Sequence, residues 1–528
     1  MGKNIFIKTA FWMPVLFLSV FFFYPLLLVF LKVLDINAVS LENNFFFAGR
    51  YFWNSFVQAI FSTLLSFLIG FPAAYLVARN DFFGKNFLKS ISLVPFVFPS
   101  ILGVLFFVIR FGYNGVLNRA LMGFFGLSEP PIQVLYGFYG IILAHAFYNF
   151  PVFLRIIGNS WESLEGKMEV TAKTLGANNF QVFFMITLPQ LLPSIIAAAS
   201  IVFIYSFMSF AIVLTLGGAG FSTIETGIFY AINRQLDFSG AALLALIQFG
   251  FLFFVLVLLN RFSKNFVEQE FEGKKSKAGV VSKVFALMLG ITIAVPVLAL
   301  ILFSVSTQNG FSLSVIEEIF SGKNTLTGDT ALGSIFNSLF FALIAAFFSV
   351  LFGLMLSFSL QRKNNWLIEG LVISSLAVSG VMLGFGYILG FSSNFFWFIP
   401  LGHAVIAFPF AYKIISHALN KISRETVFAA TVSGASPLKN FLLIQLPQIK
   451  GAVASAASFS FAISLGELGL VMLLSQGKFA TMNVYIQRFL SVYNIQAACA
   501  MGLILIFFSG ISFYVIEKTI GKSGVKWI

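Results

Sequence analysis

Ionisable side chains within apolar stretches are the first candidates for chemistry in this 528-residue sequence. His145 and His403, two of only three histidines, each lie inside a long apolar segment. Two imidazoles could bind a metal ion or relay a proton, but neither has carboxylates or cysteines clustered beside it to complete such a site. We therefore predict that both histidines form hydrogen bonds between packed helices, and that the chain has no metal site.

Glu467 is the next candidate, because it stands in the apolar segment AISLGELGLVMLL. A carboxylate at membrane depth usually faces a cavity or a partner rather than lipid. We predict that Glu467 lines a translocation pathway, together with Ser206 and Ser464. Ser209 lies 258 positions before Glu467, so a repeat at that spacing would make the pathway asymmetric.

The sequence holds no phosphate-binding loop. The nearest match, Gly521-Lys522-Ser523, has Ile516 where the motif requires its first glycine, and it follows the last apolar segment. No catalytic residue is therefore predicted, and any ATP that drives this protein must be hydrolysed by another chain.

The composition indicates which elements position these residues. The mean hydropathy is +0.96 and only 10% of residues are charged, far outside the usage of soluble domains. A transmembrane helix needs about 20 apolar residues, so we predict an all-α membrane protein with about 12 transmembrane helices. Their centres are expected near residues 21, 66, 98, 146, 202 and 250, and then near 293, 348, 378, 408, 461 and 507.

Lysine and arginine positions give the expected orientation. If the N-terminus, with Lys3 and Lys8, is cytoplasmic, 24 of the 32 basic residues fall on the cytoplasmic side. Topology then explains the net charge of +13, and no nucleic-acid partner is predicted. The first apolar stretch, about 11–31, is too long for a signal-peptide core and is expected to be retained. The eight basic residues outside would be Lys32, Arg50, Arg110, Arg119, Arg234, Lys323, Lys478 and Arg488.

An internal repeat divides the chain. Gly176 and Gly434 are 258 residues apart, and the same offset aligns LAHAFYNFP (143–151) with LGHAVIAFP (401–409). Six helices in each half, an even number, make the two halves parallel. We predict a first repeat at 1–262, a basic cytoplasmic linker at 263–283 and a second repeat at 284–528.

Two short polar stretches, TLGANNFQVFFMITLPQ (174–190) and VSGASPLKNFLLIQLPQ (432–448), interrupt the apolar segments at equivalent positions. In the first, Val182, Phe183, Ile186 and Pro189 fall on one face of a helix. Gly176 can end a preceding short helix. Each stretch is therefore predicted to form a helix, a glycine turn, a second helix and a proline stop, as a hairpin parallel to the membrane.

The spacing of glycine, nine residues, isoleucine, one residue and Leu-Pro resembles the cytoplasmic EAA loop of permease subunits in bacterial ABC importers. That family resemblance implies that the loop's short coupling helix docks on an ATP-hydrolysing subunit. The acidic start of the motif is displaced, to Glu169 and Glu425. In the first loop the implied residues are Glu169, Ala172, Gly176, Ala177, Ile186, Leu188 and Pro189. In the second they are Glu425, Ala429, Ala430, Gly434, Ala435, Ile444, Leu446 and Pro447.

A fused pair of repeats is typical of thiamine and ferric-iron importers, and residues 140–151, 209–232 and 241–248 look most like thiamine permeases. The resemblance implies two copies of an ABC ATPase that bind ATP and magnesium, a periplasmic or lipid-anchored substrate-binding protein, and residence in the bacterial inner membrane with both termini cytoplasmic. No cofactor is expected on this chain. The loops around Glu225 and Tyr485 resemble the family's outer gate and contact surface for the binding protein, although an ordinary polar loop remains an alternative.

Other readings stay open from the sequence. A ferric-iron permease is the nearest alternative. A secondary transporter also has 12 helices in two parallel halves, but it would need a coupling-ion site and would leave the paired loops without a purpose. A channel or scaffold leaves them unexplained as well.

Overall fold

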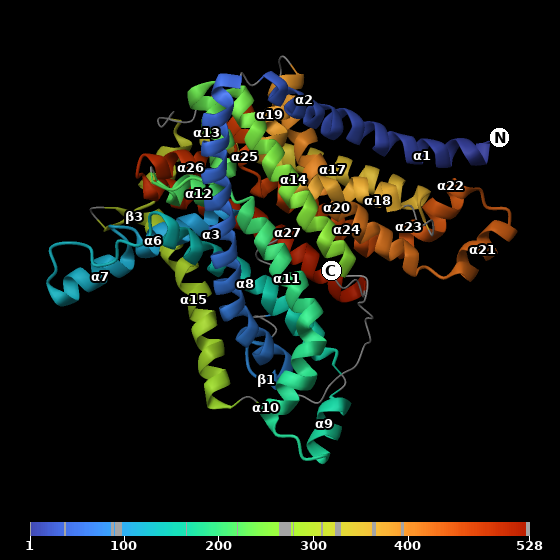
Figure 1. The fold of residues 1–528 in the computed structure, drawn as a ribbon, viewed down its shortest axis with the longest axis horizontal. Coiled ribbons are helices and arrows are strands. Elements are labelled where there is room, and N and C mark those ends of the chain that lie inside the picture. Colours follow the sequence, from blue (N-terminus) through green and yellow to red (C-terminus); the bar gives the residue numbers. More distant parts are fainter. Residues whose placement is uncertain are drawn as a thin grey trace.

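The structure, a computed structural model, describes residues 2–35, 38–85, 89, 98–164, 166–218, 220–262, 276–277, 279–307, 310–322, 329–361, 366–391 and 395–523. These residues are mostly helical (Figure 1). In two short strand pairs, β1 (Asn80–Asp81) runs parallel to β2 (Ser276–Lys277), and β3 (Ser306–Thr307) runs antiparallel to β4 (Gly310–Phe311). Most of the predicted linker, 263–283, lies outside the described residues.

The first half of the chain is a series of long helices joined by short ones. Its elements are α1 (Gly2–Leu18), the π-helical turn η1 (Ser19–Phe23), α2 (Tyr24–Lys32), η2 (Val33–Asp35), α3 (Ala38–Arg79), α6 (Ser100–Phe111), α7 (Val116–Phe125), α8 (Phe138–Glu162), α9 (Lys167–Thr174), α10 (Asn179–Val182), the π-helical turn η3 (Phe183–Thr187), α11 (Leu188–Phe207), α12 (Ala211–Leu216), α13 (Ile224–Tyr230), η4 (Ala231–Gln235) and α14 (Phe238–Phe262).

The second half is built in the same way. Its elements are α15 (Val280–Val305), α16 (Ser314–Phe320), α17 (Ala331–Ser359), α18 (Trp366–Ser374), η6 (Ser375–Ala377), α19 (Gly380–Gly390), α20 (Phe395–Lys421), α21 (Arg424–Val432), α22 (Pro437–Asn440), the π-helical turn η7 (Phe441–Gln445), α23 (Leu446–Gln448), α24 (Lys450–Gly466), α25 (Gly469–Leu474), α26 (Met482–Ser491) and α27 (Ile495–Ser523).

Nine described helices are long and apolar enough to cross a membrane, or up to 11 if each of two bent pairs counts as one span. The bent pairs are Ile368–Ala377 with Gly380–Gly390, at 100°, and Pro437–Gln448 with Lys450–Gly466, at 78°. The prediction of a helical membrane protein is confirmed in this form, whereas the count of 12 stays a prediction. Near the expected centre at 98, residues 90–97 lie outside the described part of the chain.

The order of elements from α8 to α14 recurs from α20 to α27. In each series a long helix leads to a short helical hairpin, a second long helix, two short helices and a final long helix. This recurrence supports the predicted duplication. The exact boundaries of the two repeats stay a prediction.

Each half places its first helices against the other half. Along α2, Pro25 lies so close to α19 that a Cβ added at Gly386 would be 2.8 Å from the Pro25 Cβ, and the Tyr387 hydroxyl donates to Phe21 O at 2.8 Å. In return, α15 packs against α6 of the first half and α27 of its own half. The two repeats are therefore interleaved in space, so neither buries its apolar surface alone.

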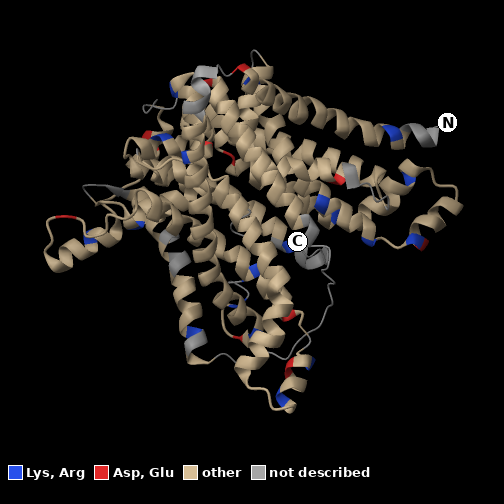
Figure 2. Cartoon of the chain, in the orientation of Figure 1, with Lys and Arg blue, Asp and Glu red and all other residues tan. Residues whose placement is uncertain are grey.

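The two hairpins lie far apart at the edge of the molecule, α9 and α10 at the lower tip and α21 and α22 at the right in Figure 1. Charged residues lie mainly at these tips and along the margins, and few are found in the helical body between them (Figure 2). Charges so placed can stay in water while the helical body lies in lipid.

Candidate functional site

The first hairpin turns at a glycine whose backbone only that residue adopts easily. Gly176 has φ of +90°, and its N–H donates to Lys173 O at 3.0 Å. The next residue, Ala177, donates to Ala172 O at 2.9 Å. These two bonds form a Schellman motif, which satisfies the last carbonyls of α9. The predicted glycine turn is confirmed, and Ala172 and Ala177 are its backbone partners.

The second hairpin repeats this motif. Gly434 has φ of +82°, its N–H donates to Thr431 O at 3.1 Å, and Ala435 donates to Ala430 O at 3.1 Å. Ala429, also predicted for this loop, accepts a bond from Ser433 N at 3.0 Å. A left-handed residue ends both short helices, and the chain reverses direction within three residues.

The second helix of each hairpin begins with a side-chain cap. Asn178 Oδ1 accepts from Gln181 N at 2.8 Å, and Gln181 Oε1 accepts from Asn178 N at 2.9 Å, which completes a capping box. At the equivalent place in the second hairpin, Ser436 Oγ accepts from Lys439 N at 3.3 Å. Different residue types therefore start the two helices at the same position.

A π-helical turn precedes each Leu-Pro pair. In η3, Leu188 N–H donates to Phe183 O, and Gln190 Nε2 donates to Ile186 O at 3.1 Å. The second hairpin repeats both bonds, from Leu446 to Phe441 and from Gln448 to Ile444 at 3.0 Å. The Ile, Leu and Pro positions of the predicted loop thus share one local geometry in the two halves.

The prediction that a proline ends each hairpin is wrong for the first copy. Residues 179–207 form one continuous span through η3, with Pro189 at the start of α11. Pro189 is tolerated there because it closely follows the π turn, whose wider loop relieves crowding of the proline ring. In the second copy the chain does bend, by 78°, at Ile449, which leaves the helical region with ψ of 8°.

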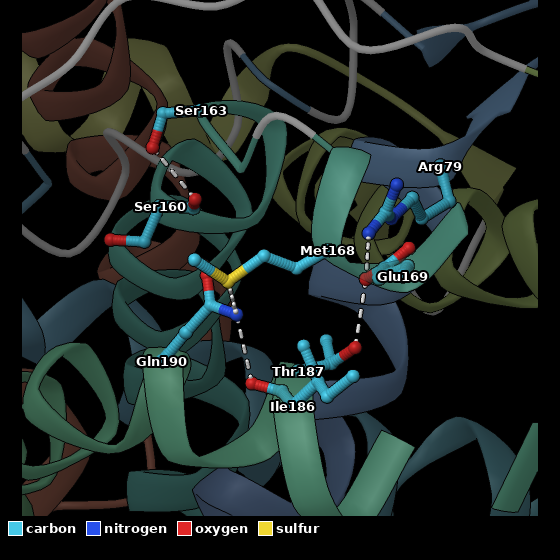
Figure 3. Close-up of polar contacts among 8 residues, drawn as sticks. All are labelled: Arg79, Ser160, Ser163, Met168, Glu169, Ile186, Thr187 and Gln190. Atoms are coloured by element: carbon cyan, nitrogen blue, oxygen red, sulfur yellow. Dashed lines mark hydrogen bonds and ion pairs between the residues drawn. The ribbon is translucent and has the colours of Figure 1, made fainter. Parts of the chain in front are cut away.

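Glu169 ties the first hairpin to a long helix (Figure 3). Its Oε1 accepts from Arg79 Nη2, at the end of α3, at 2.5 Å and from Thr187 Oγ1, in η3, at 2.7 Å. Both side chains of the ion pair are 21% exposed, so water only partly screens it. This ion pair therefore connects the first hairpin to α3, in the body of the molecule.

The second hairpin lacks this brace. Val427 stands at the position equivalent to Glu169, and its carbonyl accepts from Asn440 Nδ2 at 3.1 Å. Glu425, the acid predicted for this loop, is exposed in the first turn of α21. The two loops are alike in backbone and differ in polar contacts.

Both hairpins expose apolar side chains at equivalent positions. The exposed pairs, each 258 residues apart, are Val170 and Phe428, Phe180 and Leu438, Phe184 and Leu442, and Met185 and Leu443. Pro189 and Pro447 are exposed as well, whereas Ile186, Leu188, Ile444 and Leu446 are half-buried. An apolar patch preserved twice on a protruding hairpin is typical of a docking surface.

A cavity of about 230 Å³ lies between the two halves. The first half contributes α8, the junction of α11 and α12, and Glu225 at the start of α13. The second half contributes the start of α19 and the break between α24 and α25, where Glu467 lies. The structure thus places Glu467 on a cavity, as the sequence suggested, and brings Glu225 to the same cavity.

The other two pathway candidates, Ser206 and Ser464, are not part of this lining. Ser206 Oγ accepts from Asn149 Nδ2 at 3.2 Å, and Ser464 Oγ bonds to His403 Nδ1 at 2.6 Å. His145 Nδ1 bonds in the same manner to Ser62 Oγ at 3.0 Å. Both histidines therefore make the predicted bonds between helices. A pathway role for the two serines stays a prediction.

Two residues predicted for an outer contact surface are buried. Glu225 is 0% exposed, and its Oε1 accepts a bond from Gln248 Nε2 in α14. Tyr485, in α26, is 1% exposed and stacks on Phe489. Both side chains are therefore covered in this structure, and a role of their loops in binding the substrate-binding protein stays a prediction. The described residues include no group of three or more His, Cys, Asp or Glu placed to hold a metal ion.

Sequence reasoning missed two polar residues of this region. Asn149 lines the cavity, and Gln248 supports Glu225. A signal was present, because the repeat aligns Asn149 with Ala407 and Gln248 with Ile506. Polar residues found in only one copy of a duplicated apolar helix indicate a local task that the other copy lacks.

Comparison with known proteins connects these features to a family. Residues 66–270 match the family described as binding-protein-dependent transport system inner membrane component. The chain is 26% identical to the thiamine transport system permease protein ThiP of Escherichia coli (strain K12), over 90% of both chains. It is 26% identical to ThiP of Haemophilus influenzae, over 87% of this chain and 86% of that protein. It is 27% identical to the ferric transport system permease protein FbpB of Actinobacillus pleuropneumoniae, over 86% of this chain and 68% of that protein. The chain therefore resembles, along most of its length, membrane permeases of binding-protein-dependent transport.

Proposed function

We propose that this chain is a membrane-spanning subunit of an ABC importer that carries thiamine across the bacterial inner membrane. ATP and magnesium bind a separate ATPase, and a periplasmic or lipid-anchored protein delivers the substrate. The observation that carries this proposal is the pair of hairpins with one backbone geometry and matching exposed apolar positions. A secondary transporter has no use for two such surfaces.

One ATPase subunit would dock on each hairpin. The two hairpins lie at separate tips (Figure 1), so a single small partner cannot cover both, whereas two copies of one partner can. Basic residues near the apolar patches, Lys167 and Lys173 in α9 and Arg424 and Lys439 in the second hairpin, favour a partner with acidic groups around an apolar cleft. Movement of such a partner would act on α3 through the contact of Arg79 with Glu169.

Both hairpins and both termini should then face the cytoplasm. Asn178→Cys and Ser436→Cys should each react with a membrane-impermeant maleimide only when the cytoplasmic face is open, because both residues lie on the hairpins. The natural Cys499 is buried and should not react with the maleimide. Glu129→Cys, in an exposed loop near α7, should react from the opposite face. Labelling of Asn178→Cys and Ser436→Cys from different faces would contradict the parallel arrangement of the halves.

The choice of thiamine rests on the relatives. Three of them, ThiP of Escherichia coli, Salmonella typhimurium and Haemophilus influenzae, are 26% identical to this chain and match it along 86–92% of their own length. The ferric permeases are equally similar but match over 68–71% of theirs. Two carboxylates at one cavity also suit a cationic substrate.

Transport in vesicles tests the substrate. Vesicles that hold this chain and its ATPase should accumulate thiamine when ATP is inside and the binding protein is outside. Omission of either should lower uptake to the level of empty vesicles, because the permease alone has no source of energy. Uptake of ferric iron without thiamine would contradict the substrate assignment and leave the importer mechanism in place.

A further inference from the structure

We propose that the cavity between the two halves is a binding site for a singly charged organic cation, held by Glu225 of the first half and Glu467 of the second. This inference deepens the proposed function, because it rests on the chain being a transport permease and names the chemistry its pathway selects. It assigns a shared role to two acids that lie 242 positions apart in the sequence.

The cavity is lined by two acids and, within the described part of the chain, by no lysine or arginine that could pair with them. Neither acid takes part in an ion pair among the described residues. Two ionised carboxylates at one cavity would repel each other, and a bound cation would stabilise them.

Glu225 offers acceptor atoms at the site. Its Oε1 accepts from Gln248, while its Oε2 is buried and has at most the Ser379 hydroxyl, which lines the same cavity, as a described partner. The neighbouring Asn149, 2% exposed, is similar, because its Nδ2 donates to Ser206 and its Oδ1 has no described partner. Buried acceptors with too few donors are costly, and both belong to residues that line the cavity. A ligand that carries donors as well as positive charge would satisfy them.

Glu467 accepts a hydrogen bond from the start of α25 and also lines the cavity. Its Oε1 accepts from Leu470 N, at the start of α25, at 3.0 Å. The same carboxylate lies directly on α19, since a Cβ added at Gly380 would be 2.0 Å from Oε1. Glu467 is therefore fixed in position between the starts of two helices, and it remains partly exposed. A carboxylate held in this way meets a ligand without first reorganising.

The equivalent positions in the other half carry no acid, so neither glutamate serves a structural role that both halves share. The position equivalent to Glu467 is Ser209, and the position equivalent to Glu225 is Asn483. Asn483 Nδ2 donates to Leu465 O at 2.6 Å and so ties α26 to the neighbouring break in the chain. Glu225 offers only acceptors, so it cannot donate to a backbone carbonyl in this way, and its partner is Gln248 in α14 instead. Each half thus contributes one acid, at a different position, to one cavity.

The lining favours an organic cation over a bare metal ion. Tyr148, Tyr205 and Phe210 bring aromatic rings to the cavity, and such rings attract organic cations. The described residues provide no group of three or more metal ligands. A volume of about 230 Å³ exceeds that of one dehydrated ion and suits a ring or small ammonium group.

Equilibrium binding to the purified complex of this chain with its ATPase, without binding protein, tests the site. Thiamine and tetramethylammonium serve as organic cations, and ferric citrate serves as the metal probe. Glu225→Gln and Glu467→Gln should each weaken binding of both organic cations roughly tenfold to a hundredfold, the usual effect of losing a charged hydrogen-bond partner. Glu129→Gln, which removes an exposed acid far from the cavity, should leave affinity unchanged.

A double variant that moves the acid to the other half distinguishes loss of the charge from loss of folding as the cause of weaker binding. Ser209→Glu combined with Glu467→Ser returns the acid to the cavity from the equivalent position of the first half, and it should restore part of the affinity lost in Glu467→Ser. The thermal midpoint of each variant reports on assembly. Unchanged affinity in both glutamine variants, or loss of affinity that follows the thermal midpoint and is not restored by the swap, would overturn the proposal.

The outcomes also separate this inference from the proposed function. If wild-type vesicles fail to carry thiamine but tetramethylammonium binding depends on both acids, the cation site stands and the thiamine assignment falls. If thiamine is carried and neither acid affects binding or uptake, the importer stands and the cation site falls. Tighter binding of ferric citrate than of either organic cation would likewise overturn the site.

Discussion

Replacing Gly176 or Gly434 with proline should abolish substrate-stimulated ATP hydrolysis by the assembled transporter. The two glycines have φ of +90° and +82°, whereas the proline ring holds φ near −65°. Proline also removes the N–H that donates to Lys173 O in one hairpin and to Thr431 O in the other. The turn would open, and the docking helix after it would lose its direction. We expect stimulated hydrolysis to fall to the unstimulated rate in both variants.

The membrane part should survive this change, because no atom lies within 4 Å of a Cβ added at either glycine. Yield and thermal midpoint of the membrane complex should therefore stay close to wild type. Alanine at the same positions provides a graded control, since a left-handed alanine costs only about 1–2 kcal/mol. Gly126→Pro, at a left-handed glycine after α7, is the matched control away from the hairpins. Full stimulation in Gly176→Pro and Gly434→Pro would contradict the coupling role.

A charge on the exposed apolar patch of both hairpins should prevent the ATPase from binding. Met185 is 75% exposed and Leu443 is 72% exposed, at equivalent positions of the two hairpins. An aspartate there would have to be buried without a partner on docking, which costs several kcal/mol. The double variant Met185→Asp with Leu443→Asp should lose at least tenfold in affinity for the ATPase, measured by co-purification and by titration of detergent-solubilised complexes.

The two single variants test whether each hairpin binds its own ATPase subunit. If each hairpin docks one ATPase subunit, Met185→Asp and Leu443→Asp should each weaken assembly, and the double variant should weaken it more than either. Phe124→Asp is the matched control, because Phe124 is 83% exposed in α7, away from both hairpins. Normal ATPase binding by the double variant, with weaker binding to lipid vesicles, would assign the patch to the membrane surface instead.

The sequence by itself determined the local architecture of the loops. Gly176 and Gly434 act through hydrogen bonds that span at most five residues, and Asn178 and Ser436 cap helices three residues on. Interactions of this range depend on residue types at fixed spacing, so a pattern in the sequence is enough to predict them. The membrane class follows as directly, because a long apolar segment has no stable alternative to a helix in lipid.

Only the tertiary structure decided which distant residues meet. Arg79 and Glu169 are 90 positions apart, and the contact exists only in the first half, because Val427 replaces the acid in the second. Glu225 was expected in an outer loop, and it lines the same cavity as Glu467 because α13 packs against α19. The exchange of first helices between the halves, and the continuous helix through Pro189, likewise depend on packing between segments far apart in the chain. Packing of this kind depends on the shapes of surfaces that form after the helices do, and residue spacing along one segment carries no record of it.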